Sequence, residues 1–210
     1  MHDKTKRQKI FIVGPAAAGK TSARRIIKQI LAHRDIAVAD LSIEDAHRSL
    51  CPPPGRLGYY HYDRHGALIL EKRDQQIPAA LRFLAQACFR ASTTTGFIAE
   101  FTHSEPTNAL QDYFGDTLPN ATILQISARL SDRLQRNRMR KRLKIPEEVV
   151  TSEVENIDEE GQATLASYGA SVYNIKNISS KGAFSRNIAT VAFDLLDPNL
   201  PGDQLRTWLG

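Results

Sequence analysis

The chain has 210 residues, 41% of them hydrophobic, which is enough to fill the core of one sizeable domain, and no apolar run approaches the length of a membrane span. The net charge of +5 permits an anionic ligand or a nucleic acid as partner without choosing between them. Cys51 and Cys88 match no zinc-binding or redox spacing, so we expect a reducing, cytoplasmic location. A basic N-terminus before apolar residues 10–13 has the outline of a secretory signal, but Gly14 and Pro15 interrupt too short an apolar run.

The first half of the chain begins with a strand pattern followed by a helix pattern. Runs of β-branched and aromatic residues predict strands, and isoleucines at helical spacing predict the first helix. Prolines and a glycine at 51–55 interrupt any regular element. The expected elements are a strand over 9–14, a helix over 20–32, a strand over 36–43 that ends near Asp40, a short helix over 44–50, a hairpin over 59–70 and a helix over 77–91 with Pro78 in its first turn.

The second half continues this alternation. A proline and two glutamates open the segment 146–156, and both suit the start of a helix. The expected elements are a strand over 96–101, a helix over 107–114, a strand over 121–127, a very basic helix over 129–142, a helix over 146–156, a strand over 171–177 and a closing helix over 184–196.

Five strands that alternate with helices indicate βαβ crossovers, and therefore an α/β fold: a five-stranded parallel sheet with helices on both faces. Ligands of such sheets bind at the carboxyl ends of the strands. We expect a single domain over 1–210, with its functional residues at that edge or in segments that fold over it.

A glycine-rich motif, GPAAAGKT, stands between the first predicted strand and the first predicted helix. Its glycines let backbone N–H groups turn inward around phosphate oxygens, and the helix adds the positive end of its dipole. Lys20 is expected to reach the β- and γ-phosphates of a nucleotide, and the Thr21 hydroxyl to bind Mg²⁺. An ordinary strand-to-helix turn is the alternative. The expected nucleotide-binding residues are Gly14, Pro15, Ala16, Ala17, Ala18, Gly19, Lys20, Thr21 and Ser22.

This motif and the five-strand alternation resemble the P-loop NTPase superfamily, and the short chain with its late arginine-rich helix resembles the nucleoside and nucleotide kinase group. The segment GFIAEFTHSEP is also similar to P-loop kinase-like proteins in which Glu-Phe ends the third strand. The resemblance implies transfer of the γ-phosphoryl group of Mg-ATP to a small-molecule acceptor such as a nucleoside or nucleotide. One departure is Ala17, where nucleotide kinases often carry a glycine, because alanine disfavours a left-handed backbone.

Two carboxylates are candidates for roles in phosphoryl transfer. Glu100 ends the third strand after apolar residues, where a carboxylate is costly unless it is paired or near a metal. The resemblance makes Glu100 the acid that holds Mg²⁺ through water, and a salt bridge to an arginine is the alternative. It also implies that Asp40, at the end of the second strand, contacts the acceptor hydroxyl or a metal-bound water, whereas a cap or turn aspartate is the structural alternative.

The basic helix carries arginines on one face. Like charges at this spacing repel each other, so an anion is expected to lie among them. The resemblance makes residues 128–156 a lid that closes over the transferring phosphate. A solvated basic face or a nucleic-acid patch is the alternative. Of the aligned residues Arg129, Arg133, Arg136 and Arg140, we expect the last three to reach the phosphate.

The resemblance places the acceptor in the region between the second and third main strands, at about 44–76. Tyrosines and histidines in the segment 59–66 suit stacking on a base, and Arg56 or Arg64 suits an acceptor phosphate, although a half-buried hairpin explains them equally well. The loop after the fifth strand is expected near the adenine, with simple turn formation as the alternative. Its polar residues are Asn177, Ser179 and Ser180.

Two further functions stay open from the sequence. A P-loop NTPase with a regulatory or switch role would need no second substrate. A nucleic-acid end kinase or binding protein would suit the basic composition, and its affinity for nucleic acid would fall steeply with salt. We expect a monomer or a homodimer without a membrane partner.

Overall fold

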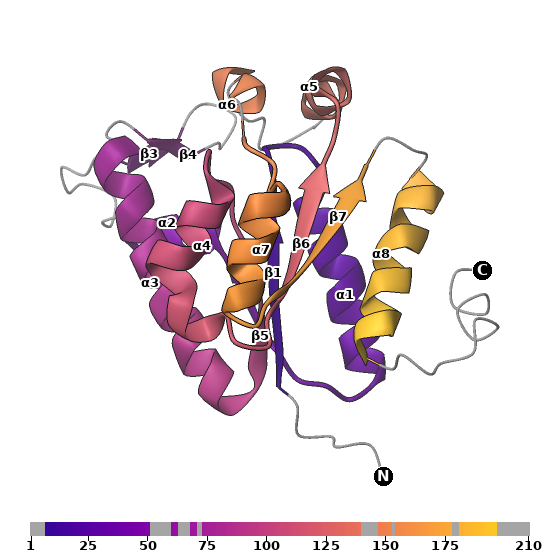
Figure 1. Cartoon of the computed structure of the whole chain (residues 1–210). Helices are drawn as coiled ribbons and strands as arrows, with labels where there is room; N and C mark the ends of the chain where they lie inside the picture. Colours follow the sequence, from indigo (N-terminus) through magenta and orange to yellow (C-terminus); the bar gives the residue numbers. More distant parts are fainter. Residues whose placement is uncertain are drawn as a thin grey trace, which may run out of the picture.

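A computed structural model describes residues 7–50, 60–62, 68–70, 73–139, 147–152, 154–177 and 181–196. Its main sheet has five parallel strands in the order β2-β5-β1-β6-β7, which confirms the predicted fold class (Figure 1). Every neighbouring pair in this sheet is parallel, so the connections must cross over one face of the sheet or the other. The strands are β1 (Gln8–Val13), β2 (Ala39–Ser42), β5 (Gly96–Glu100), β6 (Thr122–Ser127) and β7 (Ser171–Lys176).

Helices cover both faces of the sheet (Figure 1). One face carries α1 (Lys20–His33) and α8 (Lys181–Leu196), which pack against each other. The other carries a larger group, comprising α3 (Arg73–Thr94), α4 (Pro106–Phe114), a 3₁₀ turn, η1 (Gly115–Thr117), and α7 (Glu159–Ser167).

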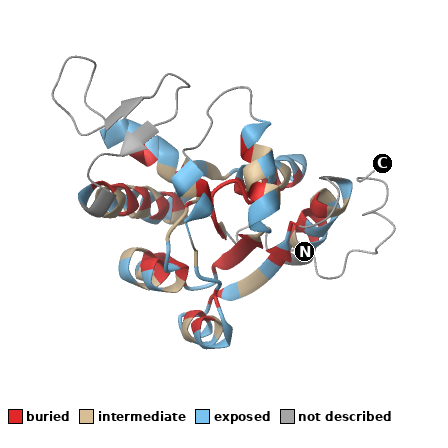
Figure 2. Ribbon diagram, turned by 90° about the horizontal axis from the view of Figure 1, so that it is seen from above, coloured by how far each residue is buried: buried red, intermediate tan, exposed pale blue. Residues whose placement is uncertain are grey.

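The alternation of side chains along β1 divides the core between these two faces. Ile10 and Ile12 belong to the cluster under α1 and α8, whereas Phe11 and Val13 belong to the cluster under α3, α4 and α7. All four side chains are buried because β1 is the central strand, and the buried residues run through the middle of the molecule in Figure 2. The rigid centre of the fold therefore lies directly below the glycine-rich motif, which follows Val13.

The carboxyl ends of the strands face the remaining short elements. Helices α5 (Leu130–Arg138) and α6 (Glu147–Thr151) lie above this edge in Figure 1. Helix α2 (Ile43–Leu50) follows β2, and β3 (Tyr60–Tyr62) pairs antiparallel with β4 (Leu68–Leu70), which confirms the predicted hairpin. Ser42 begins α2 with a capping pair, since its hydroxyl donates to the Asp45 carboxylate (2.6 Å) and accepts from the Asp45 backbone N–H (3.1 Å).

Helix α7 was not predicted from the sequence. Its start is nevertheless encoded locally, because the Asp158 carboxylate accepts a hydrogen bond from the backbone N–H of Gly161 (2.8 Å) and two glutamates occupy the first turn. The predicted helix over 146–156 was too long, since α6 ends at Thr151. Beyond it, the buried Gln125 holds the chain by accepting from the backbone N–H of Ile157 (2.7 Å).

Three further predictions need correction. Asp40 is the second residue of β2 and not its end, which is Ser42. Pro78 is the sixth residue of α3 and does not lie in the first turn, because the helix begins at Arg73. The basic helix α5 ends at Arg138, and Arg140 lies outside the described residues.

Candidate functional site

The glycine-rich motif forms a tight loop between β1 and α1. Gly14 has φ of 141°, and a Cβ there would collide with the carbonyl oxygen of Ile126 on β6. Gly19 has φ of 112° and caps the N-terminus of α1 in the left-handed region. Both positions need glycine because both have a positive φ, and Gly14 also needs it because the chain passes close to β6 there. The two terminal glycines of the motif therefore shape the loop as the sequence predicts.

The backbone of the loop is strained at Ala17. Its φ is 60°, which is the left-handed region that alanine disfavours. The strain is of the order of 1 kcal/mol, and it is concentrated in the loop that leads to the helix N-terminus. A non-glycine residue in this conformation persists only where its surroundings impose it, so the packing of the loop fixes the backbone here.

Lys20 lies folded over the loop. The side chain is 6% exposed, and its ammonium donates to the carbonyl oxygens of Gly14 (2.9 Å) and Pro15 (2.8 Å). The charge therefore sits at the mouth of the loop, next to the N-terminus of α1, where the helix dipole also favours an anion.

Thr21 and Glu100, the two predicted metal ligands, are brought together. The Thr21 hydroxyl donates to Glu100 Oε1 at 2.9 Å, although 79 positions separate the residues in the chain. Glu100 reaches this point because it ends β5, which pairs with β1. Glu100 Oε2 also lies 3.4 Å from Arg24 Nε, so Glu100 makes the salt bridge considered as the alternative as well.

Asp40 is held by cations on α1. Its carboxylate lies 2.8 Å from Lys28 Nζ and 3.3 Å from Arg24 Nε. Arg24 thus stands between the carboxylates of Asp40 and Glu100 in a chain of alternating charges. The role of Asp40 toward an acceptor stays a prediction, and in this structure the carboxylate is engaged in ion pairs.

Arg24 was missed by the sequence analysis. A signal for it exists, because Arg24 follows Thr21 by three residues on a helix, so both side chains lie on the face that meets the end of β5. Its guanidinium also lies within hydrogen-bond reach of the Leu41 carbonyl oxygen on β2 (3.4 Å). Arg24 therefore links α1 to both strands on this side of the site.

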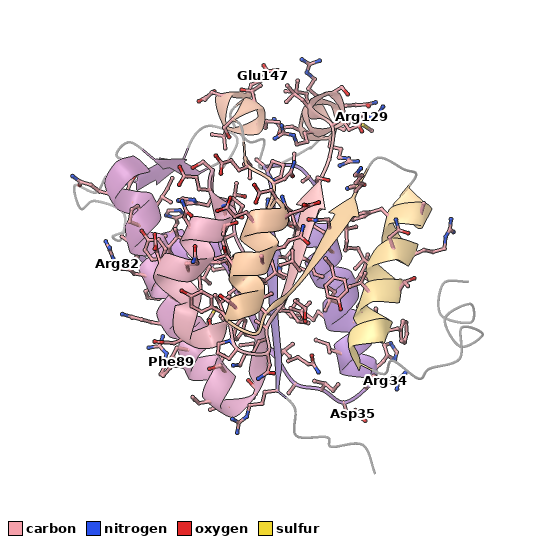
Figure 3. All side chains as sticks on the ribbon, viewed as in Figure 1. Arg34, Asp35, Arg82, Phe89, Arg129 and Glu147 are labelled. Carbon is pink, nitrogen blue, oxygen red and sulfur yellow. The ribbon has the colours of Figure 1, made fainter. Side chains whose placement is uncertain are left out.

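The arginines of α5 have different environments. Arg133 is 8% exposed, and its Nε and Nη1 have no hydrogen-bond partner among the residues that the structure describes. Burial lowers the pKa of this guanidinium from its ordinary value. Arg136 instead donates to Ala18 of the loop and to Asn177 after β7. Arg129, labelled in Figure 3, is exposed and pairs with Asp132.

The region that was predicted to hold the acceptor is described only in part. His47 on α2 is buried, and burial lowers its pKa to about 4 against the opposing effect of Glu44. The side chains of residues 51–74, including Arg56, Arg64 and the tyrosine-rich segment, lie outside the described set, as do Ser179 and Ser180. None of the helices that the structure describes combines the length and apolarity that crossing a bilayer requires.

Comparison with solved structures identifies the fold. A sugar kinase from a Janibacter species has a TM-score of 0.59 at 15% identity, with 91% of this chain and 95% of that chain covered. The APS kinase of Mycobacterium tuberculosis, solved with AMPPNP and APS, has a TM-score of 0.57 at 14% identity, with 91% of this chain and 98% of that chain covered. A gluconokinase from Sinorhizobium meliloti has a TM-score of 0.53 at 12% identity, with 93% of this chain and 100% of that chain covered.

No family model matches the sequence, and no curated protein matches it. At the identities found among solved structures, the similarity is one of fold. The chain therefore has the fold of the P-loop small-molecule kinases, as the glycine-rich motif and the strand alternation predicted.

Proposed function

We propose that the protein is an ATP-dependent kinase that transfers the γ-phosphoryl group of Mg-ATP to a small-molecule acceptor. The observation that carries this proposal is the meeting of the Lys20 loop with the Thr21–Glu100 pair at the carboxyl edge of a kinase-type sheet. Phosphoryl transfer requires positioning and charge neutralisation more than covalent chemistry, and this edge supplies both.

The residues of the loop fit a nucleotide polyphosphate. Backbone N–H groups at the start of α1 and the Lys20 ammonium would bind the phosphate oxygens. Lys20 already lies at the loop mouth, where its present acceptors are two carbonyl oxygens. We expect phosphate oxygens to take over these hydrogen bonds, because a charged acceptor makes the stronger bond to an ammonium.

Thr21 and Glu100 fit a magnesium ion. Hydroxyl and carboxylate oxygens are ligands that Mg²⁺ accepts, and in nucleotide sites it takes one or two carboxylates with phosphates and waters completing its octahedron. Mg²⁺ when bound would neutralise charge on the phosphates. Arg24 would keep Glu100 oriented toward Thr21 through its contact with Oε2.

Arg133 supports an anionic ligand on the α5 side. A guanidinium in protein is charged at every ordinary pH, and burying it with unpaired nitrogens costs free energy unless an anion arrives. We propose that Arg133 binds a phosphate of the nucleotide. Residues 128–156 would then act as the lid of one domain over 1–210, with Arg140 as a second candidate for the same contact.

The acceptor class is proposed from the neighbours and from the region 44–76. The structures named above are kinases of a sugar, of gluconate and of APS, which suggests a hydroxyl group as the point of attack. A nucleoside or nucleotide also stays in the proposal because of the tyrosine-rich segment 59–66. Asp40 would orient the acceptor hydroxyl only after exchanging one of its cationic partners.

The test is transfer of labelled γ-phosphate from Mg-ATP across a panel of sugars, sugar acids, nucleosides, nucleotides and short oligonucleotides. Lys20→Ala is the inactive comparison, and Arg82→Met, which removes an exposed charge on α3, is the control. We expect one acceptor class to be labelled by the wild type and the control, and turnover to fall at least about a hundredfold in Lys20→Ala.

The other outcomes identify the alternatives. ADP formation that no acceptor stimulates would contradict the kinase and favour an NTPase switch. Labelling of oligonucleotide ends alone, with affinity that falls steeply with salt, would favour a nucleic-acid end kinase, as the net charge of +5 permits. We further propose a cytoplasmic monomer or homodimer, which light scattering of the purified chain would distinguish.

A further inference from the structure

We infer that Arg136 is a positioning residue that acts with Asn177 to hold the nucleotide-binding loop in its phosphate-binding shape, and that it does not touch the transferred phosphate. The purpose of this contact rests on the proposed function. Its existence rests on hydrogen bonds that join three distant segments of the chain.

One guanidinium joins these segments. Arg136 Nη1 on α5 donates to the Ala18 carbonyl oxygen in the loop at 3.2 Å. Arg136 Nη2 donates to the Asn177 backbone carbonyl at 2.9 Å and to its side-chain oxygen at 3.1 Å. Asn177 Nδ2 donates to the same Ala18 carbonyl at 2.6 Å. Ala18, Arg136 and Asn177 therefore form a closed set of contacts, which we call the loop latch.

Asn177 is itself fixed before it meets the loop. The residue is 6% exposed, and its backbone N–H donates to the Ser127 carbonyl oxygen at 2.7 Å, just after β7 and at the end of β6. A Cβ at Gly19 would lie 2.5 Å from Asn177 Nδ2. The latch thus packs directly against Gly19, the left-handed glycine that caps α1, and a side chain at position 19 would displace it.

The loop needs this support for a geometric reason. Backbone N–H groups turn inward to bind phosphate only if the carbonyls between them turn outward and find other donors. The Ala18 carbonyl precedes Gly19 and receives two such donors from the latch. Without them, the peptide between Ala18 and Gly19 is free to rotate, because glycine tolerates many backbone conformations.

The latch also explains why arginine serves here. A planar guanidinium presents fixed, parallel donors to three oxygens, whereas an ammonium is a point charge on a flexible stem. The contrast with Arg133, three residues earlier on α5, separates the two roles. Arg133 is buried with nitrogens that lack protein partners in the described part of the chain, and Arg136 directs both its terminal nitrogens at the loop and Asn177.

The first experiment measures the latch without any ligand. Backbone amide hydrogen exchange of residues 16–21 is compared in wild type, Arg136→Met, Arg136→Lys and Asn177→Ala. The control is Arg82→Met, whose arginine is labelled on the outer side of α3 in Figure 3. We expect these amides to exchange about tenfold faster in the three latch variants than in the wild type, and at the wild-type rate in the control. Exchange that stays at the wild-type rate in all variants would overturn the inference.

The second experiment measures affinity for pyrophosphate and for ATP by calorimetry. If the latch shapes the loop, both ligands bind about tenfold more weakly to Arg136→Met and to Arg136→Lys alike. Wild-type affinity in Arg136→Lys would show a direct charge contact with phosphate. A loosened loop with unchanged affinities would show a structural role alone. Each of these two results overturns the inference.

A double-mutant cycle gives the sharpest form of the test. Because Arg136 and Asn177 support the same carbonyl, Arg136→Met combined with Asn177→Ala should bind pyrophosphate about as weakly as either single variant. A hundredfold loss, the product of two independent tenfold losses, would contradict the latch. Failure of the wild type to bind either ligand would instead contradict the proposed function, and the exchange result would still decide whether the latch exists.

Discussion

The loop side and the α5 side of the candidate site differ in how their polar groups are satisfied. On the loop side, the Lys20 ammonium, the Ala18 carbonyl and the Thr21–Glu100 pair all make hydrogen bonds within the chain. On the α5 side, Arg133 is about as buried as Lys20, but two of its nitrogens have no partner within the described ranges. The two sides are in contact, since Arg136 on α5 donates to the Ala18 carbonyl of the loop.

This difference separates groups that would exchange a protein partner for a ligand, such as Lys20, from Arg133, whose two unpaired nitrogens have no protein partner to exchange. A satisfied buried group stabilises the folded state, whereas an unpaired buried charge destabilises it by several kcal/mol at most after relaxation. The protein tolerates that cost at Arg133, and we interpret this as the mark of an anion-binding position. The predictions below test each side of the comparison, from the largest expected effect to the smallest.

Glu100→Gln tests the loop side most severely. A neutral amide is a poorer magnesium ligand, so we expect turnover to fall about a hundredfold and the Mg²⁺ concentration for half-maximal rate to rise. The measurement is a Mg²⁺ titration of the transfer reaction. Glu160→Gln, an exposed residue in the first turn of α7, is the matched control. An unchanged Mg²⁺ dependence in Glu100→Gln would remove Glu100 from the metal site.

His47 is a buried group whose protonation should affect the stability of the protein in the acid range. Its pKa is about 4 in the folded protein against 6.5 in its ordinary state, so between these pH values the unfolded chain binds more protons. The contribution of His47 to the free energy of unfolding should therefore fall by about 3 kcal/mol as pH drops from 6.5 to 4.

The measurement is urea denaturation across this pH range in wild type, His47→Gln and His33→Gln. The His47 variant should show a smaller fall, and the variant at His33, which is exposed near the end of α1, should follow the wild type. Parallel pH profiles for wild type and His47→Gln would show that His47 does not contribute to acid sensitivity.

Arg133→Met tests the α5 side. Removing a buried charge that lacks protein partners should raise the free energy of unfolding by about 1–3 kcal/mol while weakening phosphate binding about tenfold. Urea denaturation and calorimetry with pyrophosphate measure the two effects. For stability, the matched control is Arg138→Met on the same helix, whose exposed pair with Glu147 should be worth about 1 kcal/mol or less. A destabilised variant with unchanged phosphate binding would contradict the assignment of Arg133.

Ala17→Gly should have the smallest effect. Glycine adopts the φ of 60° found at this position without strain, so we expect the free energy of unfolding to rise by about 1 kcal/mol. Ala32→Gly in the regular helix α1 should lower it by about 0.5–1 kcal/mol. The same sign of change in both variants, measured by urea denaturation, would contradict the strain at Ala17.

The sequence predicted those parts of the site that are encoded locally. The loop follows from spacing within eight residues, and Glu100 follows from its place at the end of an apolar strand. Their meeting was predictable because carboxyl ends of parallel strands share one edge. Ala17 was noted from the sequence only as a departure from the glycine that related proteins often carry, and its left-handed φ of 60° is a finding of the structure.

Several other contacts between distant residues were not predicted. That Arg136 reaches the phosphate stays a prediction, but its contacts with Ala18 and Asn177, 118 and 41 positions away in the chain, were not foreseen. Asp40 was expected at the strand end, yet α1 places Lys28 beside it. Helix α7 was missed although Asp158 and two glutamates mark its start, because residues up to 156 had been assigned to the preceding helix.

The measurement that tests the central claim most directly is calorimetric titration of a non-hydrolysable ATP analogue with Mg²⁺ into wild type, Lys20→Ala and Arg133→Met. We expect the wild type to bind, Lys20→Ala to bind at least about a hundredfold more weakly, and Arg133→Met to lose about tenfold. A wild type that does not bind the analogue, or a Lys20→Ala variant that binds it equally well, would contradict the account.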